Sequence, residues 1–293
     1  MAAITNTTTT AQITTEVKEI DFVSRFTRNI DALREIMGIM NPVRKTLGTK
    51  LIASKAAVVL QDGNVAEGDE VPLSQATVTP VVYEDITLEK YRKAVTAEAV
   101  AKFGAAIASQ KTDDAFINEL QGNILDRFYA FMQTGTLTGS ENSFQMAVAM
   151  AAAQVKNKFK QLRLNYSDIV VFVNTLDAGR YLGSANITVQ TKNGIEYVKD
   201  FMGVRTMIIS SDIPEGKIVA TPADNIVMYY IDPADSDFRE LGLEYNTGVE
   251  ETSLIGVHKE GNYGRVMGDT HVLMGIKLFA EYIDAIAIYT ITE

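Results

Sequence analysis

The clearest pattern of apolar positions in the chain lies between residues 112 and 135. Apolar side chains recur there at three- and four-residue spacing, with polar residues between them, which predicts an amphipathic helix with one buried face. Thr112 or Asp113 is expected to cap its N-terminus, and Gly135 is expected to end it in a left-handed conformation. The apolar stripe is broad enough to make this helix the central packing element of the chain. Its members are Phe116, Ile117, Leu120, Ile124, Leu125, Phe128, Phe131 and Met132.

Two further segments show the same helical spacing. Residues 21–40 predict a helix that Pro42 ends, because proline cannot continue the hydrogen-bonded backbone. Residues 140–162 predict another amphipathic helix, with basic residues near its C-terminal end. Residues 2–15 are mainly Thr, Ala and Asn, so we expect them to form a flexible arm that orders only against another surface.

Residues 43–86 have a different composition, rich in small and β-branched residues and poor in large apolar ones. Asp62 and Gly63, near the middle, form a tight-turn signal, so the segment predicts a long hairpin. Two arms of about twenty residues at roughly 3.3 Å each would reach on the order of 60 Å, farther than the radius of a compact domain. Such a hairpin is marginally stable alone, so we expect its Val and Leu side chains to contact another subunit. The alternative is an ordinary mobile surface loop.

The second half of the chain is dominated by apolar runs of strand length. Asn174 follows the first run and is expected to cap a brief helix through Tyr181. The sequence IPEG, residues 213–216, predicts a turn between two strands. With the helices, these runs predict a mixed α+β architecture. The strands are expected at residues 168–173, 205–210, 226–231, 272–282 and 285–290.

Composition excludes several classes of protein. The 293 residues contain no cysteine, which removes disulfides, thiolate nucleophiles and cysteine metal sites. A formal charge of -10 argues against a surface that grips nucleic acid, since phosphate binding needs clustered Lys and Arg. The sequence shows neither a run of about 18 apolar residues nor a secretion signal. We therefore expect that the protein does not associate with a membrane and that it assembles in a cytoplasm.

Candidate chemistry is sparse. The sequence has no phosphate loop and no nucleotide, hydrolase or metalloprotease motif, so we expect no catalytic residues, no metal and no cofactor. His258 and His271 are the two histidines, and we interpret them as residues with ordinary structural roles; the alternatives are a shared metal site or a general base. Residues 232–240 form an acidic segment that we interpret as a solvated loop. The glycine-rich residues 261–268 predict a flexible turn.

The order of these elements resembles that of the major capsid proteins of tailed bacteriophages, which have the Hong Kong 97 fold. The likeness extends over nearly the whole chain from about Val43, although each motif is short. Its segments are EGDEVPLSQATVTPVVYEDI (residues 67–86), KYRKAVTAEAV (90–100), VFVNTLDAGRYLG (171–183), GVRTMIISSDIPEGKIVATPADNIVMYYI (203–231) and VLMGIKLFAEYIDAIAIYTI (272–291).

The resemblance implies an α+β, Hong Kong 97-type capsid fold with an N-terminal arm, an extended loop, a peripheral domain built on a spine helix, and an axial domain. The central helix, residues 112–135, would be the spine. The implied division is residues 1–42 for the N-terminal arm and helix, 43–86 for the extended hairpin loop, 87–164 for the peripheral domain, 165–240 for the axial domain, and 241–293 for return strands that end in the axial sheet.

The resemblance also implies a function. It predicts a structural protein, not an enzyme, that self-assembles through pentamers and hexamers into the icosahedral shell of a tailed phage around double-stranded DNA. A separate scaffolding protein and a portal are the expected partners, DNA is packaged without sequence-specific contact, and the protein resides in the virion after assembly in the host cytoplasm. Contacts between copies are expected at Lys50, Lys55, Asp62, Gly63, Glu67, Asp69 and Glu70.

Two other interpretations fit the sequence. An encapsulin-like shell of a cellular compartment would have the same fold and differ in its contents. An acidic α+β enzyme would act through His258 or His271 together with residues 232–240.

A lysine-to-asparagine crosslink, known in one branch of the capsid family, would use Lys50 or Lys55.

Overall fold

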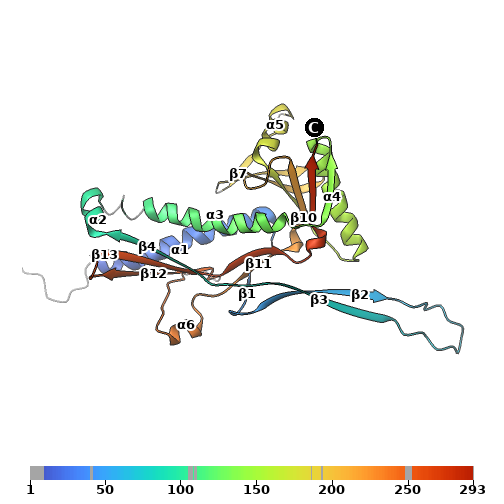
Figure 1. The fold of residues 1–293 in the computed structure, drawn as a ribbon, viewed down its shortest axis with the longest axis horizontal. Coiled ribbons are helices and arrows are strands. Elements are labelled where there is room, and N and C mark those ends of the chain that lie inside the picture. The colour runs from blue at the N-terminus through green and yellow to red at the C-terminus, as the bar shows by residue number, and fades with distance from the viewer. Residues whose placement is uncertain are drawn as a thin grey trace, which may run out of the picture.

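The computed structural model describes residues 10–39, 42–104, 108, 111–185, 187–192, 194–247 and 253–292. The molecule is elongated, with helix α3 (Thr112–Met132) along its middle and a two-stranded hairpin projecting from one end (Figure 1). Four sheets are present in the described part, with seven, three, three and two strands. The α+β architecture expected from the sequence is therefore confirmed.

Helix α3 is the buried spine that its apolar spacing predicts. Phe128 is 1 % exposed and Met132 is fully buried, and the other members of the stripe are buried or half-buried. Tyr129 joins the buried face although it was not in the predicted stripe. The rings of Phe128 and Tyr129 each lie 5.7 Å from the ring of Phe172, which belongs to a strand of the large sheet. The helix is thus fixed to that sheet by an aromatic cluster.

The predicted ends of this helix are wrong in detail. Lys111 is the N-cap residue and makes no side-chain capping bond, while the Thr112 hydroxyl donates to the Ala108 carbonyl oxygen at 2.8 Å. Asp113 is buried and ion-paired to Lys93 and to Lys259, so tertiary contacts use the carboxylate that the sequence offered as a cap. Gly135 does not adopt positive φ. A Cβ there would lie 2.7 Å from the Ile286 carbonyl oxygen, so close packing accounts for the glycine.

Helix α1 (Thr10–Met37) is longer at its start than the sequence suggested. Its first residues fall in the segment expected to be a flexible arm, and residues 2–9 of that arm lie outside the described residues. Ile13, Val17 and Ile20 continue the helical spacing upstream, which explains the earlier start. The helix ends at Met37, before Gly38 at φ 70°, and not at Pro42. It packs against α3 and the neighbouring sheet.

Beside α1 and α3 lies an antiparallel sheet of order β12-β13-β4. Its strands are β4 (Glu89–Thr96), β12 (Ile255–Asn262) and β13 (Met267–Met274). Residues 90–100, one of the segments that carry the resemblance, begin in β4 and continue into helix α2 (Ala97–Phe103), where the Thr96 hydroxyl accepts from the Ala99 amide and caps the helix. The glycine-rich turn expected at residues 261–268 joins β12 to β13, with its turn residues at 263–266.

The long strand predicted at residues 272–282 is instead two strands in different sheets. β13 ends at Met274, and β14 (Ile276–Ala280) pairs with β11 (Ile226–Tyr230), which in turn pairs with β1 (Val43–Arg44). Gly275 separates them where a Cβ would lie 3.0 Å from the Ile231 side chain. The chain therefore changes sheets at a position where a larger residue would require the Ile231 side chain to shift.

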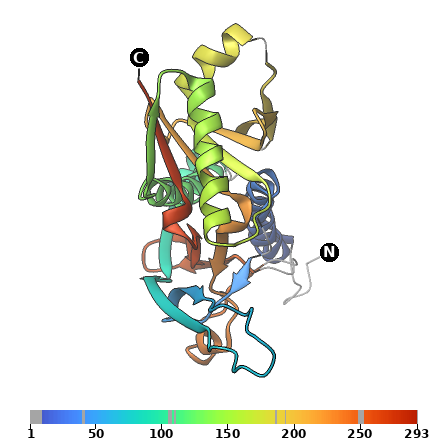
Figure 2. The same ribbon diagram turned by 90° about the vertical axis from the view of Figure 1, so that its right-hand side faces the viewer.

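The largest sheet has the order β5-β15-β10-β6-β9-β8-β7 and lies beside helix α4 (Phe144–Gln161), as Figure 2 shows. The β5–β15 and β6–β9 pairs are parallel, and the other pairs are antiparallel. The strands are β5 (Leu137–Glu141), β6 (Ile169–Asn174), β7 (Gln190–Lys192), β8 (Ile195–Phe201), β9 (Val204–Ser210), β10 (Lys217–Pro222) and β15 (Ala287–Ile291).

Local signals around this sheet are partly confirmed. The Asn174 side chain accepts from the Leu176 amide at 2.7 Å, so it caps helix α5 (Thr175–Ala185) as predicted. Helix α4 begins at Phe144 and not at Ser140, because the preceding residues pair with β15 and Ser143 is the N-cap. The IPEG turn leads into β10, a strand that the sequence analysis missed.

Strand β6 has buried side chains on both faces, so the large sheet separates two hydrophobic clusters. Val170 and Phe172 face α3 and α1, whereas Val171 and Val173 face α4 and α5.

The remaining short helices are α6 (Ser236–Glu240) and the 3-10 turns η2 (Ala223–Asn225) and η3 (Ile283–Ala285). The five-part division of the chain stays a prediction, although α4 packs on the sheet that contains β6, β9 and β10.

Among the described residues, no helix is both long and apolar enough to span a bilayer.

The aromatic contact between α3 and the sheet gives a first prediction. Phe128→Ala removes a ring that is 1 % exposed, so the unassembled chain should lose about 3–5 kcal/mol of unfolding free energy. Asn118→Ala, on the exposed side of the same helix, should change it by less than about 0.5 kcal/mol. Calorimetric melting of both variants measures the difference, and equal melting temperatures would show that α3 does not anchor the core.

Candidate assembly site

The hairpin is built from β2 (Lys50–Val59) and β3 (Gln75–Asp85), which pair with each other as a separate two-stranded sheet. Figure 1 shows it extending away from the rest of the molecule. The hairpin predicted for residues 43–86 is confirmed, but its strands are shorter than expected. At roughly 3.3 Å per residue, the ten residues of β2 span about 33 Å, and a long loop completes the reach.

The predicted tight turn at Asp62 and Gly63 is wrong. Strand β2 ends at Val59 and β3 begins at Gln75, so residues 60–74 form a broad loop. The Asp62 carboxylate accepts from the Asn64 amide at 2.9 Å, a local bond that turns the chain without closing the hairpin. A second turn lies near Gly68, which has φ 93°.

The far end of the hairpin exposes apolar side chains. Leu73 is 93 % exposed and Leu60 is 67 % exposed, so most of the surface of both residues is in contact with water. Neither residue belongs to a hydrophobic cluster of the body. A group of exposed apolar side chains on an extended arm is typical of a surface that another molecule covers. We call this group the hairpin apolar patch; its members are Val58, Val59, Leu60, Val71, Leu73 and Val78.

The contact candidates predicted from sequence divide between the two ends of the hairpin. Lys50 is exposed at the start of β2, near the body, and Lys55 lies within β2 opposite Thr79. The other five lie in the loop and are exposed, so the structure does not bring them together with Lys50. Their contacts with other copies stay a prediction. These five are Asp62, Gly63, Glu67, Asp69 and Glu70.

The hairpin is joined to the body by β1 and Arg44. β1 pairs in parallel with β11, and the Lys45 amide donates to the Tyr230 carbonyl oxygen at 2.8 Å. The Arg44 guanidinium lies 3.2 Å from the Asp232 carboxylate and 2.9 Å from that of Asp235. The hydrogen bond from Arg44 holds the pKa of Asp235 below its usual range.

This ion pair corrects the interpretation of residues 232–240 as a solvated acidic loop. Part of the segment forms α6, and two of its carboxylates hold the strand that leads into the hairpin. Sequence analysis missed Arg44 because Arg44 and Asp235 are 191 positions apart, and no local pattern links them.

After the hairpin, where the chain re-enters the body, Glu89 at the start of β4 is hydrogen-bonded to the spine helix α3. The Arg127 guanidinium, on α3, donates to the Glu89 carboxylate at 2.7 Å, and the Tyr91 hydroxyl donates to it at 2.7 Å. Burial acts to raise the pKa of Glu89, but the hydrogen bonds from Arg127 and Tyr91 outweigh it and keep the pKa below its ordinary value. A groove of about 550 Å³ lies here, lined by Asp85, Ile86, Thr87, Arg127, Phe131 and Lys277 among others.

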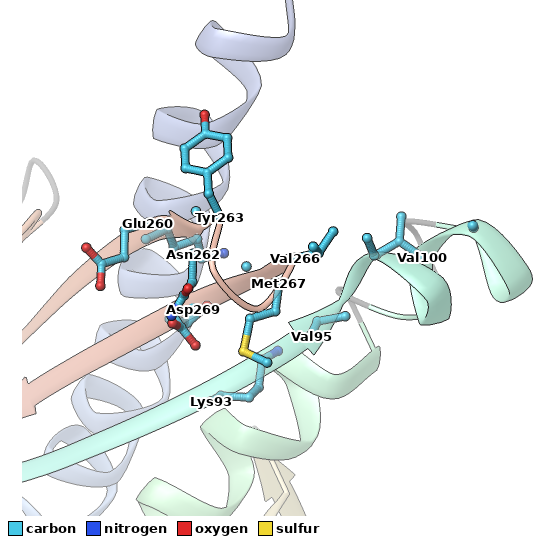
Figure 3. Close-up of a pocket in the computed structure, with 15 residues that line it drawn as sticks. Lys93, Val95, Val100, Glu260, Asn262, Tyr263, Val266, Met267 and Asp269 are labelled. Atoms are coloured by element: carbon cyan, nitrogen blue, oxygen red, sulfur yellow. The ribbon is translucent and has the colours of Figure 1, made fainter.

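The two histidines lie side by side. His258 and His271 are directly paired across β12 and β13, with ring centroids 6.4 Å apart. His271 Nε2 lies 3.1 Å from a Glu260 carboxylate oxygen. The carboxylate paired with His271 is thus that of Glu260, which lies outside residues 232–240, the segment that the enzyme hypothesis combined with the histidines. The adjoining turn borders an open pocket of about 750 Å³, drawn in Figure 3.

No protein-family model and no curated protein sequence matches the chain. Solved structures do match it. A capsid chain of cyanophage P-SCSP1u aligns over 86 % of this chain and 86 % of its own length, with 9 % identity and a TM-score of 0.56. The cyanophage A-1(L) capsid aligns over 86 % and 90 %, with 13 % identity and a TM-score of 0.55. The mature capsid of bacteriophage PhiM1 aligns over 86 % and 85 %, with 10 % identity and a TM-score of 0.53.

The chain has the Hong Kong 97 capsid fold. The elements expected from the resemblance are present in this chain: the extended hairpin, the spine helix, and the large sheet with α4 beside it. At these identities the likeness concerns the fold, and the surfaces described above carry the functional argument.

The Glu89 contact gives a pH prediction. The pKa of Glu89 is lowered in the folded state, so its stabilising effect is present above about pH 4.5 and is lost as the pH falls through the folded value. Glu89→Gln should therefore lower the unfolding free energy of the unassembled chain at pH 7 by about 1 kcal/mol. The difference should shrink as the pH is lowered toward about 3.

Calorimetry at a series of pH values measures this effect. Glu119→Gln, on the exposed side of α3, is the matched control and should melt as the parent does. A Glu89→Gln penalty that is the same at low and neutral pH would contradict the role given to the Arg127 and Tyr91 hydrogen bonds.

Proposed function

We propose that this chain is a shell-forming subunit, and more specifically the major capsid protein of a tailed phage. Copies of it would assemble through pentamers and hexamers into an icosahedral shell around double-stranded DNA. The observation that carries the proposal is the hairpin, which projects from a capsid-type body and ends in exposed apolar side chains.

The physical argument rests on what the hairpin lacks. Two-stranded hairpins are marginally stable alone, and this one adds its apolar patch to neither large hydrophobic cluster of the body. A neighbouring copy supplies the missing contact, because every copy presents both a hairpin and a body surface. Such head-to-tail contacts close into rings when the rotation between copies allows it, and many weak contacts then add up in a closed particle.

The charge of the chain suits a container for DNA. A formal charge of -10 keeps the subunit from binding phosphate tightly over its surface, so packaged DNA stays mobile. A shell role also needs no catalytic residue and no cofactor. A separate scaffolding protein and a portal are the partners that we propose, with assembly in the host cytoplasm and final residence in the virion.

The contents of the particle distinguish the two kinds of shell. Purified particles filled with double-stranded DNA and carrying a portal support the phage assignment. Small particles filled with a single enzyme would contradict it and favour an encapsulin-like compartment.

Removing the hairpin tests the proposal directly. Ala53 and Val81 are paired at its base, so residues 54–80 can be replaced by a four-residue Gly-Ser linker that joins them. The body should fold, because residues 58–80, the deleted residues whose burial the structure describes, belong to neither large core cluster, and a shorter loop lowers the entropy cost of closure. Closed particles should be lost in sedimentation velocity, while the circular dichroism spectrum and a cooperative melt remain.

A matched deletion locates the effect within the hairpin. Joining Val59 to Gln75, which are also paired, removes the loop with Leu60, Val71 and Leu73 but keeps both strands. It should also weaken assembly. Particles as robust as the parent's from both deletions would overturn the proposal, and failure of the body to fold would show that the hairpin belongs to the core.

A single exposed residue provides a finer prediction. Leu73→Asp places a charge on a side chain that is 93 % exposed, so the subunit should fold normally. Assembly should require at least about tenfold more protein, since a buried unpaired carboxylate costs more than 1.4 kcal/mol per contact. Gln61→Asp adds the same charge at an exposed polar position of the same loop and should have a much smaller effect. Light scattering against concentration measures both, and equal effects would mean that charge, not apolar contact, controls assembly.

A further inference from the structure

One face of the β12-β13-β4 sheet carries a cluster of metal-ligating side chains. Lys93 and Lys259 lie on the face toward α3, where both contact Asp113. Because side chains alternate along a strand, the next residues in β12 and β13 lie on the opposite face. Glu260 and Asp269 are directly paired across these strands there, and His271 lies two residues beyond Asp269 on the same face.

The three side chains converge. One carboxylate oxygen of Glu260, one of Asp269 and one imidazole nitrogen of His271 all lie within 4.8 Å of one another. His271 Nε2 and Glu260 Oε1 are 3.1 Å apart. Two ligands on a tetrahedral zinc ion, with bonds of about 2.1 Å, lie roughly 3.4 Å apart, so small side-chain rotations bring all three into range. Figure 3 shows Glu260 and Asp269 on neighbouring strands beside the turn that joins them.

Asp269 provides an independent observation. Its side chain is fully buried, and its Oδ1 atom has no hydrogen-bond partner among the described residues. Its Oδ2 accepts from the Arg92 guanidinium at 2.6 Å. A buried carboxylate oxygen without a partner is costly unless something else satisfies it.

We propose that Glu260, Asp269 and His271 form a binding site for a divalent transition metal ion such as Zn²⁺. Imidazole together with carboxylates suits this class of ion, and three protein ligands leave a fourth position for water. Arg92, which orients Asp269 through Oδ2, acts as an outer partner of the ligand set. The bound ion would fasten β12 to β13 next to the turn that carries Tyr263, whose side chain is 97 % exposed. This site does not depend on the shell role proposed above.

Zinc titration of the untagged full chain tests the site. After treatment with a chelator and dialysis, isothermal titration calorimetry with zinc chloride should show one saturable site per chain. His271→Ala should weaken binding by at least about tenfold, and Glu260→Gln should also weaken it. Both side chains are partly exposed, so these variants should fold, which circular dichroism without metal checks.

His258→Ala is the matched control, because His258 faces the same side of the sheet but lies outside the ligand cluster. It should bind zinc within about twofold of the parent. Melting gives a second readout, since an ion that binds the folded state raises the melting temperature of the parent and of His258→Ala, but not of His271→Ala. Absence of saturable binding by the parent would overturn the proposal, as would unchanged binding by both His271→Ala and Glu260→Gln. Loss of binding in His258→Ala equal to that in His271→Ala would overturn the ligand set.

Discussion

The central strands of the large sheet, β6, β9 and β10, are buried on both faces, and this double burial organises the molecule. Strand β6 has every side chain buried, with alternate residues packed toward the α1–α3 side and toward the α4–α5 side. The contact of Phe128 and Tyr129 with Phe172 fixes the spine helix to this sheet, and α3 in turn positions the elements that pack around it. The two cores are therefore parts of one body, because a single sheet supplies side chains to both.

The same constraint explains why the hairpin stands apart. The two large hydrophobic clusters of the body include no hairpin residue whose burial the structure describes, and ion pairs near the two ends of the hairpin connect it to the body. On one side Arg44 pairs with Asp232 and Asp235, and on the other Glu89 is held by Arg127. The hairpin apolar patch lies on the projecting part of the hairpin, where it is exposed to water in a single copy of the chain. A fold that separates its cores from its exposed apolar surface in this way is suited to assembly from many identical copies.

Elements with regular apolar spacing could be predicted from the sequence, whereas features that depend on contacts between residues far apart in the sequence could not. The spine helix, the hairpin and the fully buried strand near residue 170 were readable because their apolar spacing is regular over several residues. The helix caps were wrong because Asp113 is paired with two lysines from other strands, and Gly135 is needed for packing against Ile286. The break between β13 and β14 at Gly275 could not be predicted, because apolar and polar residues alternate on both sides of it although the two strands belong to different sheets.

Short and polar strands were the other source of error. β8 carries charged residues among its apolar ones, and β10 follows closely on the IPEG turn, so neither showed a clear period. The convergence of Glu260, Asp269 and His271 depends on strand register, which one sequence does not reveal. The inter-subunit roles of the loop residues stay predictions, because one chain shows which side chains are exposed but not what covers them.

The most direct test of the account is a cryo-electron microscopy reconstruction of the purified full chain after assembly. The account predicts a closed icosahedral particle in which each hairpin lies on a neighbouring copy, with Leu60 and Leu73 buried between the two chains. Dispersed monomers under all assembly conditions, or a particle in which the hairpin apolar patch faces solvent, would contradict it.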